Sequence, residues 1–452
     1  MSGFDLIIRN GTIVTHEDAR AMDIGVAAGK IVALEAGLDV LADEVVDEGG
    51  LHIFPGLIDS HVHFNEPGRA DWEGIATGSR ALAAGGGTMF FDMPLNAHPP
   101  TCDAESFDLK LAAAEKNSLT DFALWGGLVP GNLDKLEELA GRGVIGFKAF
   151  MANSGIEDFS CVDDATLKAG MKRAAKLGKL VAVHAESEAI TSELAKQTLA
   201  QNKTSVRDYL DSRPIHAELD AVQRAIRTAG ETGCALHIVH VSSGAGVALV
   251  ASARKLGVDV TCETCPHYLI LTEDDMVQLG GVAKCAPPLR PKSAQASLWK
   301  YVQSGQVATI GSDHSPSPPE MKLDENFLKV WGGISGGQHT LPLLITEGHV
   351  NRKLALSHIA KLTSFNVAER FNLPKNKGRI AVGADADLAL VDLKQKFTVR
   401  AEDLFYRHKQ SPYVGRALTG RVVRTILRGE TVFLNGKITG PPRGRFVEPS
   451  RL

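Results

Sequence analysis

The residues of this chain best suited to chemistry are two histidines, His61 and His63, which follow an apolar run that begins at Phe54. In an extended strand, residues i and i+2 project from the same face, so both imidazoles can point at one spot. Imidazole nitrogens are common ligands of zinc and other divalent metals, and a pair held in this way would chelate one ion. The alternative is a pair of hydrogen-bonded core histidines, and the two-histidine motif alone does not decide between them.

Other potential metal ligands stand at the ends of apolar runs further along the chain. His184, His240 and Asp313 end or follow three such runs, and Lys148 lies within a fourth, 146–151. Each of these residues alone would more often be an ordinary core or loop residue. Their recurrence at the ends of five runs predicts a metal centre.

Lys148 is the unusual member of this set, because a free ammonium beside metal cations would be costly to bury. A lysine amine that has reacted with carbon dioxide carries a carbamate, which is a carboxylate on a long arm that can bridge two metal ions. The alternative is a buried lysine paired with an acid such as Asp313. Four histidines, one aspartate and a carbamate would hold two divalent metals about 3.5–4 Å apart with a hydroxide between them, an arrangement suited to hydrolysis.

Eight short apolar runs, each followed by an Ala- and Leu-rich segment of helical character, would position these residues. The alternation predicts an α/β fold of the (β/α)₈ TIM-barrel type, in which active sites occupy the carboxyl ends of the strands. A Pro- and Gly-rich stretch, 317–340, is expected to form a long loop over the barrel mouth and to shape a substrate pocket. The predicted strands are 52–63, 85–93, 121–128, 144–150, 180–185, 235–242, 258–264 and 307–312.

The two ends of the chain have a β pattern instead. Residues 4–50 contain short apolar runs around turn signals, and Asn10-Gly11 is expected to close a hairpin. The same pattern returns after about residue 378. We therefore predict a small β-sandwich domain built from both chain ends, residues 1–51 and 378–452, beside a barrel of residues 52–377.

Charge and composition argue against macromolecular ligands. The 452 residues carry a net charge of −4 without a long basic run, so neither nucleic acid nor a membrane surface is an expected partner. The sequence has no signal-peptide layout and no apolar stretch of about 18 residues, so we expect a cytoplasmic protein that binds a small molecule. The six cysteines are expected to be reduced, and Cys262 and Cys265 are interpreted as a buried pair rather than a zinc site.

The motifs resemble those of the amidohydrolase superfamily, in its cyclic-amidase branch of hydantoinases, dihydropyrimidinases, dihydroorotases and allantoinases. The resemblance covers essentially the whole chain. The motif from Pro55 to His63 is similar to one found throughout the superfamily, whereas four finer motifs resemble those of the allantoinases. These finer motifs are 63–74, 92–96 with 99–101, 312–322 and 406–413.

Two positions differ from neighbouring families of the branch. Dihydroorotases have an arginine two residues after the second histidine, where it binds the substrate carboxylate, and this chain has Asn65. Hydantoinases and dihydropyrimidinases have a tyrosine five residues after the bridging lysine, where it polarises the scissile carbonyl, and this chain has Asn153. A neutral ring substrate is implied, with its oxyanion stabilised mainly by metals and nearby backbone N–H groups.

The resemblance also implies roles for individual residues. Asp313 would take a proton from the attacking water and pass it to the leaving nitrogen. Apart from the resemblance, His314 is the next candidate for this base, and the alternative for His314 is a residue that orients the loop. Asn96 and Ser315 are expected to hydrogen-bond the substrate, and the alternative for Asn96 is a turn cap. One metal, expected to be zinc with cobalt or manganese as alternatives, would be held by His61, His63 and Asp313, and a second by His184 and His240, with carboxylated Lys148 as the bridge.

The implied activity is the opening of the five-membered ring of allantoin to give allantoate, a step of purine catabolism. One alternative is another cyclic amidase, of the hydantoinase or dihydropyrimidinase type. A second alternative is a non-catalytic structural relative that forms regulatory oligomers, but such relatives usually lose metal ligands, and all six candidate positions are filled here. Enzymes of this branch are commonly tetramers, so a homotetramer is expected.

Overall fold

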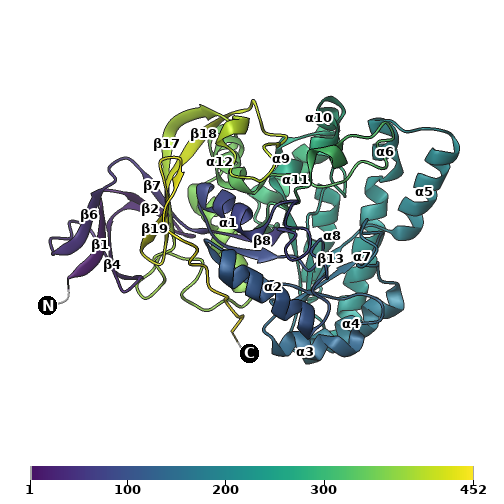
Figure 1. Cartoon of the computed structure of the whole chain (residues 1–452), viewed down its shortest axis with the longest axis horizontal. Coiled ribbons are helices and arrows are strands. Elements are labelled where there is room, and N and C mark those ends of the chain that lie inside the picture. Colours follow the sequence, from purple (N-terminus) through teal and green to yellow (C-terminus); the bar gives the residue numbers. More distant parts are fainter. Residues whose placement is uncertain (1–2, 451–452) are drawn as a thin grey trace.

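Parallel strands at the centre of the chain form a barrel in the computed structural model, which describes residues 3–450 (Figure 1). One parallel sheet contains β8 (Leu57–Val62), β9 (Gly87–Asp92) and β10 (Asp121–Leu124). A second parallel sheet runs through β11 (Gly126–Gly127), β12 (Phe147–Phe150), β13 (Val181–His184), β14 (Leu236–Ile238), β15 (Val260–Thr264) and β16 (Thr309–Ile310). Only Trp125 separates β10 from β11, so the two sheets are continuous.

Contacts between the first and last strands close the barrel. Val62 pairs in parallel with His314, and the backbone N–H of His63 donates to the carbonyl oxygen of His314 at 2.8 Å. The backbone N–H of Ser312 donates to the carboxylate of Asp59 at 2.9 Å. The predicted (β/α)₈ barrel is therefore confirmed, with the last strand placed directly beside the first.

Helices surround the barrel and turn one apolar face toward it. In α7 (Ile215–Thr232), the buried residues Ala217, Ala221, Ala225 and Ala229 recur at the four-residue spacing of one helix face. The other helices of the outer ring are α1 (Ile75–Ala84), α2 (Ala104–Asn117), α3 (Leu136–Gly141), α4 (Asp164–Lys176), α8 (Gly244–Lys255) and α11 (Lys292–Gln303). The remaining α-helices lie in the connecting segments: α5 (Glu188–Ala200), α6 (Val206–Ser212), α9 (Pro266–Ile270), α10 (Glu273–Leu279), α12 (Thr340–Leu344), α13 (Leu356–Ala360) and α14 (Asn366–Arg370). None of the helices in residues 3–450 is long and apolar enough to cross a membrane.

The predicted first strand, 52–63, is two strands that serve different sheets, so this part of the prediction was wrong. Strand β7 (His52–Pro55) pairs with strands outside the barrel, and only β8 belongs to the barrel. Gly56 lies between them, where a Cβ atom would stand 2.1 Å from the hydroxyl oxygen of Thr88. The apolar run is continuous because both strands are buried, and the sequence pattern therefore hides the break.

The two chain ends form a β-sandwich, as predicted. One sheet has the order β5 (Lys30–Glu35), β4 (Asp23–Ala27), β1 (Phe4–Arg9) and β6 (Ala42–Asp47). The other joins C-terminal to N-terminal strands in the order β20 (Lys437–Ile438), β19 (Glu430–Leu434), β18 (Ala417–Leu427), β17 (Leu388–Thr398), β7, β2 (Thr12–Val14) and β3 (Ala19–Ala21). Leu6, Ile24, Ile53 and Leu388 are buried together between the sheets. The domain limits at 51/52 and 377/378 stay predictions.

The expected hairpin at Asn10-Gly11 does not form. Strand β1 pairs with β4 and β6, whereas β2 pairs with β3 and β7, so the chain crosses from one sheet to the other at Asn10. Asn10 does adopt the left-handed conformation (φ 60°), and its N–H donates to the carboxylate of Asp23 at 2.9 Å. A Cβ atom at Gly11 would stand 2.4 Å from the side chain of Ile53. The dipeptide thus indicated a sharp turn correctly but did not indicate which strands flank it.

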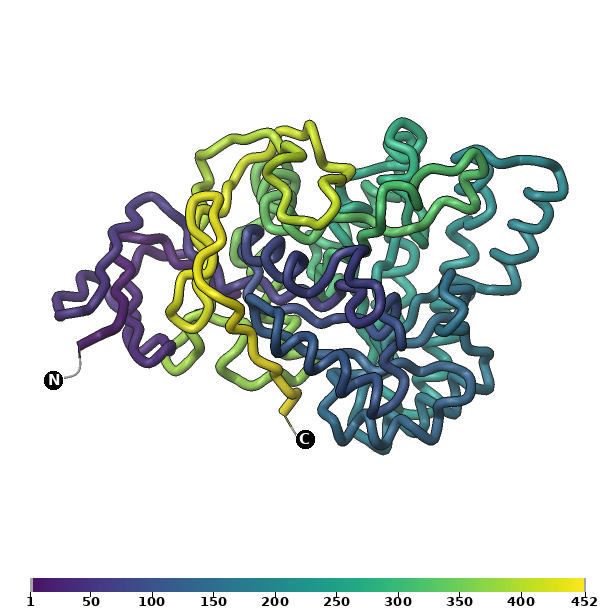
Figure 2. Tube along the Cα trace, viewed as in Figure 1, coloured from purple at the N-terminus to yellow at the C-terminus, as the bar shows by residue number. Residues whose placement is uncertain are grey.

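The C-terminal part of the chain also covers the barrel. Residues 399–416, between β17 and β18, leave the sheet and place the ring of Tyr406 4.7 Å from that of His314. The yellow C-terminal trace then runs back along the barrel beside α2 (Figure 2), where Phe446 contacts the rings of Phe107 and Phe122.

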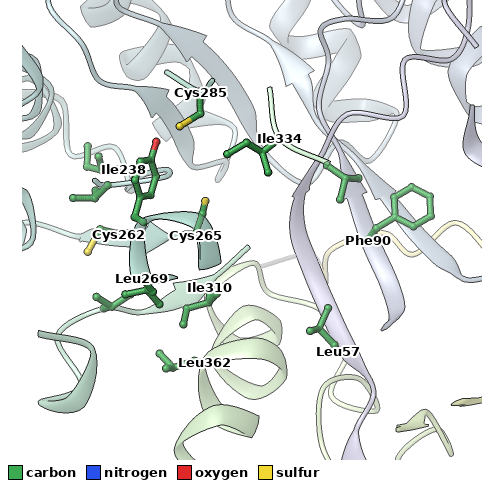
Figure 3. Close-up of a cluster of buried hydrophobic side chains, with 14 of the residues drawn as sticks. Leu57, Phe90, Ile238, Cys262, Cys265, Leu269, Cys285, Ile310, Ile334 and Leu362 are labelled. Carbon is green, nitrogen blue, oxygen red and sulfur yellow. The ribbon is translucent and has the colours of Figure 1, made fainter. Parts of the chain in front are cut away.

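The barrel core contains the predicted buried cysteine pair. Cys262 lies on β15 and Cys265 directly precedes α9, and both are free thiols. Figure 3 places them among apolar side chains that include Ile238, Leu269 and Ile310. Burial raises the pKa of the Cys262 thiol to about 12, so it is protonated at neutral pH.

Candidate metal centre and substrate cavity

His61, His63 and Asp313 come together at the carboxyl ends of the first and last barrel strands. Oδ1 of Asp313 lies 3.2 Å from Nε2 of His61 and 3.4 Å from Nε2 of His63. The potential ligand atoms of the three residues all lie within 4.8 Å of one another. The sequence dictates this arrangement, because alternate residues of one strand share a face and the last strand closes against the first. Two nitrogens and one oxygen are thereby directed at one position, as a divalent metal requires.

His184 and His240 form a second pair nearby. Nδ1 of His184 lies 3.1 Å from Nε2 of His240, and the ring centre of His240 is 5.4 Å from that of His61. Nε2 of His184 lies 3.0 Å from the carboxylate of Glu186. This bond favours the tautomer with its proton on Nε2, which leaves Nδ1 free to bind a metal.

Lys148 is completely buried on β12, beside these histidines. Within residues 3–450 its Nζ has no hydrogen-bond partner, so the ion pair with Asp313 considered above does not form. Burial lowers the pKa of Lys148 to about 7, although Asp313 and Glu263 act in the opposite direction. A large fraction of this amine is therefore neutral near pH 7, which is the form that reacts with carbon dioxide.

The charge states of the site suit a divalent metal. Burial lowers the pKa of His61, His184 and His240, so their rings are neutral and offer a lone pair. Burial alone would raise the pKa of Asp313, but His61 and His63 outweigh it and lower that pKa to about 2. Neutral imidazoles and an ionised carboxylate are the forms that bind metals.

Two of these residues have unusual backbones. His240 and Asp313 adopt positive φ angles of 40° and 47°, a region that side chains other than glycine rarely enter. Each follows a barrel strand, where the conformation turns the chain sharply. Such strained residues are concentrated at functional sites, at a cost of about 1–3 kcal/mol each.

Two buried glutamates support the histidines and were not predicted. Glu263 lies 2.8 Å from Nδ1 of His61 and accepts a hydrogen bond from the hydroxyl of Ser60 at 2.6 Å. Glu186 binds His184 and forms an ion pair with Arg213. Carboxylates in these positions fix the orientation and tautomer of a metal-binding imidazole. The available signal was an acidic residue inside the apolar run 258–264, where a charge without a partner would be unfavourable.

The candidate ligands open into a cavity of about 530 Å³. Asn96, Ser315 and Asn153 line it with His61, His63, His184, His240 and Asp313. Residues of α5 and residues 328–333 form its outer walls. The stretch 317–340 is a long loop with only short helical turns, at Pro319–Lys322 and Gly337–His339, and it lines the cavity as predicted.

The predicted substrate-binding residues lie side by side in this cavity. The side-chain amide of Asn96 donates to the hydroxyl of Ser315 at 3.4 Å. Asn153 turns its side-chain oxygen toward its own loop, where it accepts the N–H of Gly155 at 2.8 Å. Asn65 is buried and donates to the carbonyl of Pro316 at 3.2 Å, so it joins two loops rather than lining the cavity.

His314 does not lie among the cavity-lining residues. Its Nδ1 accepts the backbone N–H of Gly336 at 3.2 Å, and its ring packs against Tyr406. Burial lowers its pKa to about 3. These contacts give His314 a role in holding the last strand and its loop, and they argue against its use as the base.

The chain belongs to the amidohydrolase family, whose sequence pattern matches residues 52–432. Within that family, the allantoinase of Rubrobacter xylanophilus is 58% identical over 451 residues, which cover 100% of this chain and 99% of the relative. The allantoinase of Deinococcus radiodurans is 52% identical over 448 residues, with 99% of both chains covered. Among solved structures, the L-hydantoinase (dihydropyrimidinase) from Arthrobacter aurescens superposes with a TM-score of 0.96 at 35% identity, covering 98% of this chain and 100% of that chain.

Proposed function

We propose that this chain is an allantoinase, an enzyme that hydrolyses the ring amide of allantoin to give allantoate. The observation that carries the proposal is the full-length similarity to allantoinases, at 58% identity to the Rubrobacter xylanophilus protein. The site supports it, because four histidines, an ionised aspartate and a buried lysine gather at the inner end of one cavity. Purine catabolism is the corresponding metabolic context.

Two divalent metals would fit the donor set, with zinc as the first choice and cobalt or manganese as alternatives. His61, His63 and Asp313 would hold one metal, and His184 and His240 the other. N6-carboxylated Lys148 would contribute a bridging carboxylate, and the lack of a hydrogen-bond partner for its Nζ within residues 3–450 favours such a modification. When bound, the metals would polarise the ring carbonyl and lower the pKa of water from about 15.7 to about 7.

The side chains of the cavity would perform the remaining work. Asp313 is ionised at neutral pH, so its carboxylate can accept the proton of the attacking water and deliver it to the ring nitrogen when the C–N bond breaks. Asn96 and Ser315 would hydrogen-bond polar groups of the substrate, and their mutual hydrogen bond supports a shared role. Glu263 and Glu186 would hold the imidazoles of His61 and His184 in place.

A hydantoinase of the same chemistry is the second candidate. The close superposition with the Arthrobacter aurescens L-hydantoinase favours it, whereas Asn153 in place of the hydantoinase tyrosine opposes it. A non-catalytic structural relative is disfavoured because five of the six candidate ligands line the cavity and the sixth, Lys148, is buried beside them.

The test is a comparison of kcat/KM for allantoin, hydantoin, dihydrouracil and dihydroorotate on one metal-reconstituted preparation. Allantoin should be preferred, because a site with polar partners for its ureido arm leaves them unpaired when hydantoin binds. Dihydroorotate should be at least about tenfold poorer, since Asn65 stands where dihydroorotases have the arginine that binds its carboxylate. A preference for any of the other three substrates would contradict the proposed substrate. The proposed metal centre would not be affected by that result.

We also propose that the chain works in the cytoplasm as a homotetramer. All six cysteines are free, as is usual in reducing compartments. Leu41, Leu256 and Leu323 are largely exposed and offer apolar surface for subunit contacts. Sedimentation velocity of the purified protein tests the tetramer, and a monomer at micromolar concentration would contradict it.

A further inference from the structure

Residues 327–333 are here called the wall segment, because residues 328–333 form one side of the substrate cavity. A buried lysine holds the first half of this segment. Nζ of Lys284 donates to the carbonyl oxygens of Phe327 at 2.6 Å, Leu328 at 3.1 Å and Val330 at 2.6 Å. The same ammonium lies 4.3 Å from the ring centre of Tyr209 and 5.1 Å from that of Phe327. All three donors of this ammonium are therefore used on one short stretch of backbone.

A second buried lysine holds the other half of the wall segment. Nζ of Lys322 donates to the carbonyl oxygens of Trp331 at 3.0 Å and Gly333 at 2.6 Å. The backbone N–H of Gly333 in turn donates to the carbonyl of Lys284 at 2.7 Å, which joins the two lysines through the backbone. Gly333 also approaches Ser315 so closely that a Cβ atom would stand 2.2 Å from the carbonyl oxygen of Ser315.

These two lysines are unusual because their hydrogen bonds go to uncharged carbonyl groups. In the described part of the chain, neither ammonium forms an ion pair, although both side chains are buried. Burial without a counter-ion lowers the pKa of both lysines to about 7, so their charged form is costly here, and a sequence under no other demand would place apolar residues at these positions. The two lysines thereby fix the conformation of five carbonyl groups in a loop that otherwise has little regular structure.

The wall segment forms part of the cavity in which a ring substrate and its substituent would lie. Trp331, Gly332 and Gly333 line the cavity beside Ser315, and the metal ligands occupy its inner end. In allantoin, the ureido arm is attached to the carbon next to the scissile carbonyl, so it must extend from the inner end toward the cavity walls.

We propose that Lys284 and Lys322 are positioning residues that fix the wall segment against the ring substituent and thereby determine which substituent the enzyme accepts. The identity of this substituent as a ureido arm rests on the proposed function. The lysines act through the backbone that they hold, and they take no part in proton transfer.

Lys284→Met and Lys322→Met test the proposal, because methionine keeps most of the side-chain volume and removes the donors. For allantoin, KM should rise about tenfold or more with kcat changed much less, since the arm contributes binding in both ground and transition states. For hydantoin, which lacks the arm, kcat/KM should change less than about threefold. Equal losses on both substrates, or no loss on either, would overturn the proposal.

Hydrogen exchange of the metal-loaded protein provides a readout that is independent of activity. Exchange in residues 327–333 should be faster in both variants than in the wild type, while exchange in α11 stays unchanged. Lys292→Met, a change at an exposed lysine at the start of α11, is the matched control and should alter neither exchange nor kinetics. Lys284→Arg keeps the charge and should restore part of the protection and of the KM for allantoin.

The two proposals can fail separately. If the wild type does not hydrolyse allantoin, the proposed function is wrong, and the exchange data alone decide whether the lysines hold the wall segment. If the wild type hydrolyses allantoin but exchange in residues 327–333 is the same in both variants, the positioning role is wrong and the proposed function stands. If one variant fails to fold, the other decides the outcome.

Discussion

Asp313 has two roles in the proposed mechanism, as a metal ligand and as the base, and an amide can perform only the first. Asp313→Asn should therefore retain much of the bound metal, because the amide oxygen can still occupy a ligand position. It should lose about 10²–10⁴-fold in kcat, since the amide cannot accept and return a proton. Metal analysis and steady-state kinetics on the same preparation check this prediction. A loss smaller than tenfold with the metal retained would place the base elsewhere, and the buried ring of His314 would be a poor substitute.

The proposed role of Lys148 depends on a carboxylate group that the sequence does not encode, because the lysine amine must first react with carbon dioxide. Lys148→Ala should lose most of the activity and bind fewer than two metals per chain. Short carboxylic acids added to the assay should restore part of both, since they can occupy the space left by the carbamate. Full activity with two tightly bound metals in the unsupplemented variant would rule out the bridging role.

At the residue scale, the sequence was sufficient to predict which side chains meet at the end of one strand. It was insufficient to predict which side chains meet across the barrel. His61 and His63 could be paired because the geometry of one strand brings them together. The contact of Glu263 with His61 joins residues about 200 positions apart, and no local pattern encodes it. The carbonyl cage around Lys284 could not be predicted either, because backbone groups of a loop leave no signature in the sequence.

At the scale of elements, periodicity located the strands and helices of the barrel but not the sheet to which each strand belongs. The run 52–63 passes from the sandwich to the barrel without a change in apolar character, and Asn10-Gly11 joins two sheets instead of two paired strands. Both errors concern tertiary partners, which a local pattern cannot specify.

The buried carboxyl group of Glu73 joins two parts of the fold and makes the stability of the protein depend on pH. Glu73 lies two residues before the start of α1, and its carboxylate accepts the backbone N–H of Arg407 at 3.3 Å, which ties the start of α1 to residues 399–416. Burial raises its pKa from 4.5 to about 8, so the folded protein holds a proton that the unfolded chain releases. Stability from this group is therefore present below pH 4.5 and is lost as the pH rises toward 8.

Glu73→Gln should remove this dependence, because glutamine imitates the protonated acid. The variant should be more stable than the wild type at pH 8, by a difference on the order of a few kcal/mol, and this difference should shrink toward pH 5. Urea denaturation of both proteins at several pH values measures it, and contributions common to the two proteins cancel. A difference that does not vary with pH would show that Glu73 is ionised in the folded state.

At the scale of the whole molecule, the barrel and the β-sandwich are joined by a buried cluster of charges at the end opposite the cavity. Nζ of Lys377 lies 2.6 Å from the carboxylate of Asp121, at the start of barrel strand β10, and 2.9 and 2.8 Å from those of Asp385 and Asp387, which precede sandwich strand β17. Arg428 of the sandwich also forms an ion pair with Asp121. Burial alone would lower the pKa of Lys377, but the three carboxylates outweigh it and raise that pKa. The Lys377 ammonium therefore stays charged at the junction of the barrel and the sandwich.

Lys377→Met should destabilise the whole protein by about 3–5 kcal/mol, because it leaves buried carboxylates without their shared cation. Acidification should recover part of this loss, since protonation removes the uncompensated charges. Lys30→Met is the matched control: Lys30 also pairs with Asp385, but its side chain is 48% exposed, so the expected effect is below about 1 kcal/mol. Chemical denaturation of the three proteins at pH 5 and pH 7 provides the measurement. In both variants kcat/KM at 25 °C should stay near the wild-type value, because the cavity lies at the other end of the barrel. A loss for Lys377→Met no greater than that for Lys30→Met would mean that apolar packing, rather than this cluster, holds the barrel and the sandwich together.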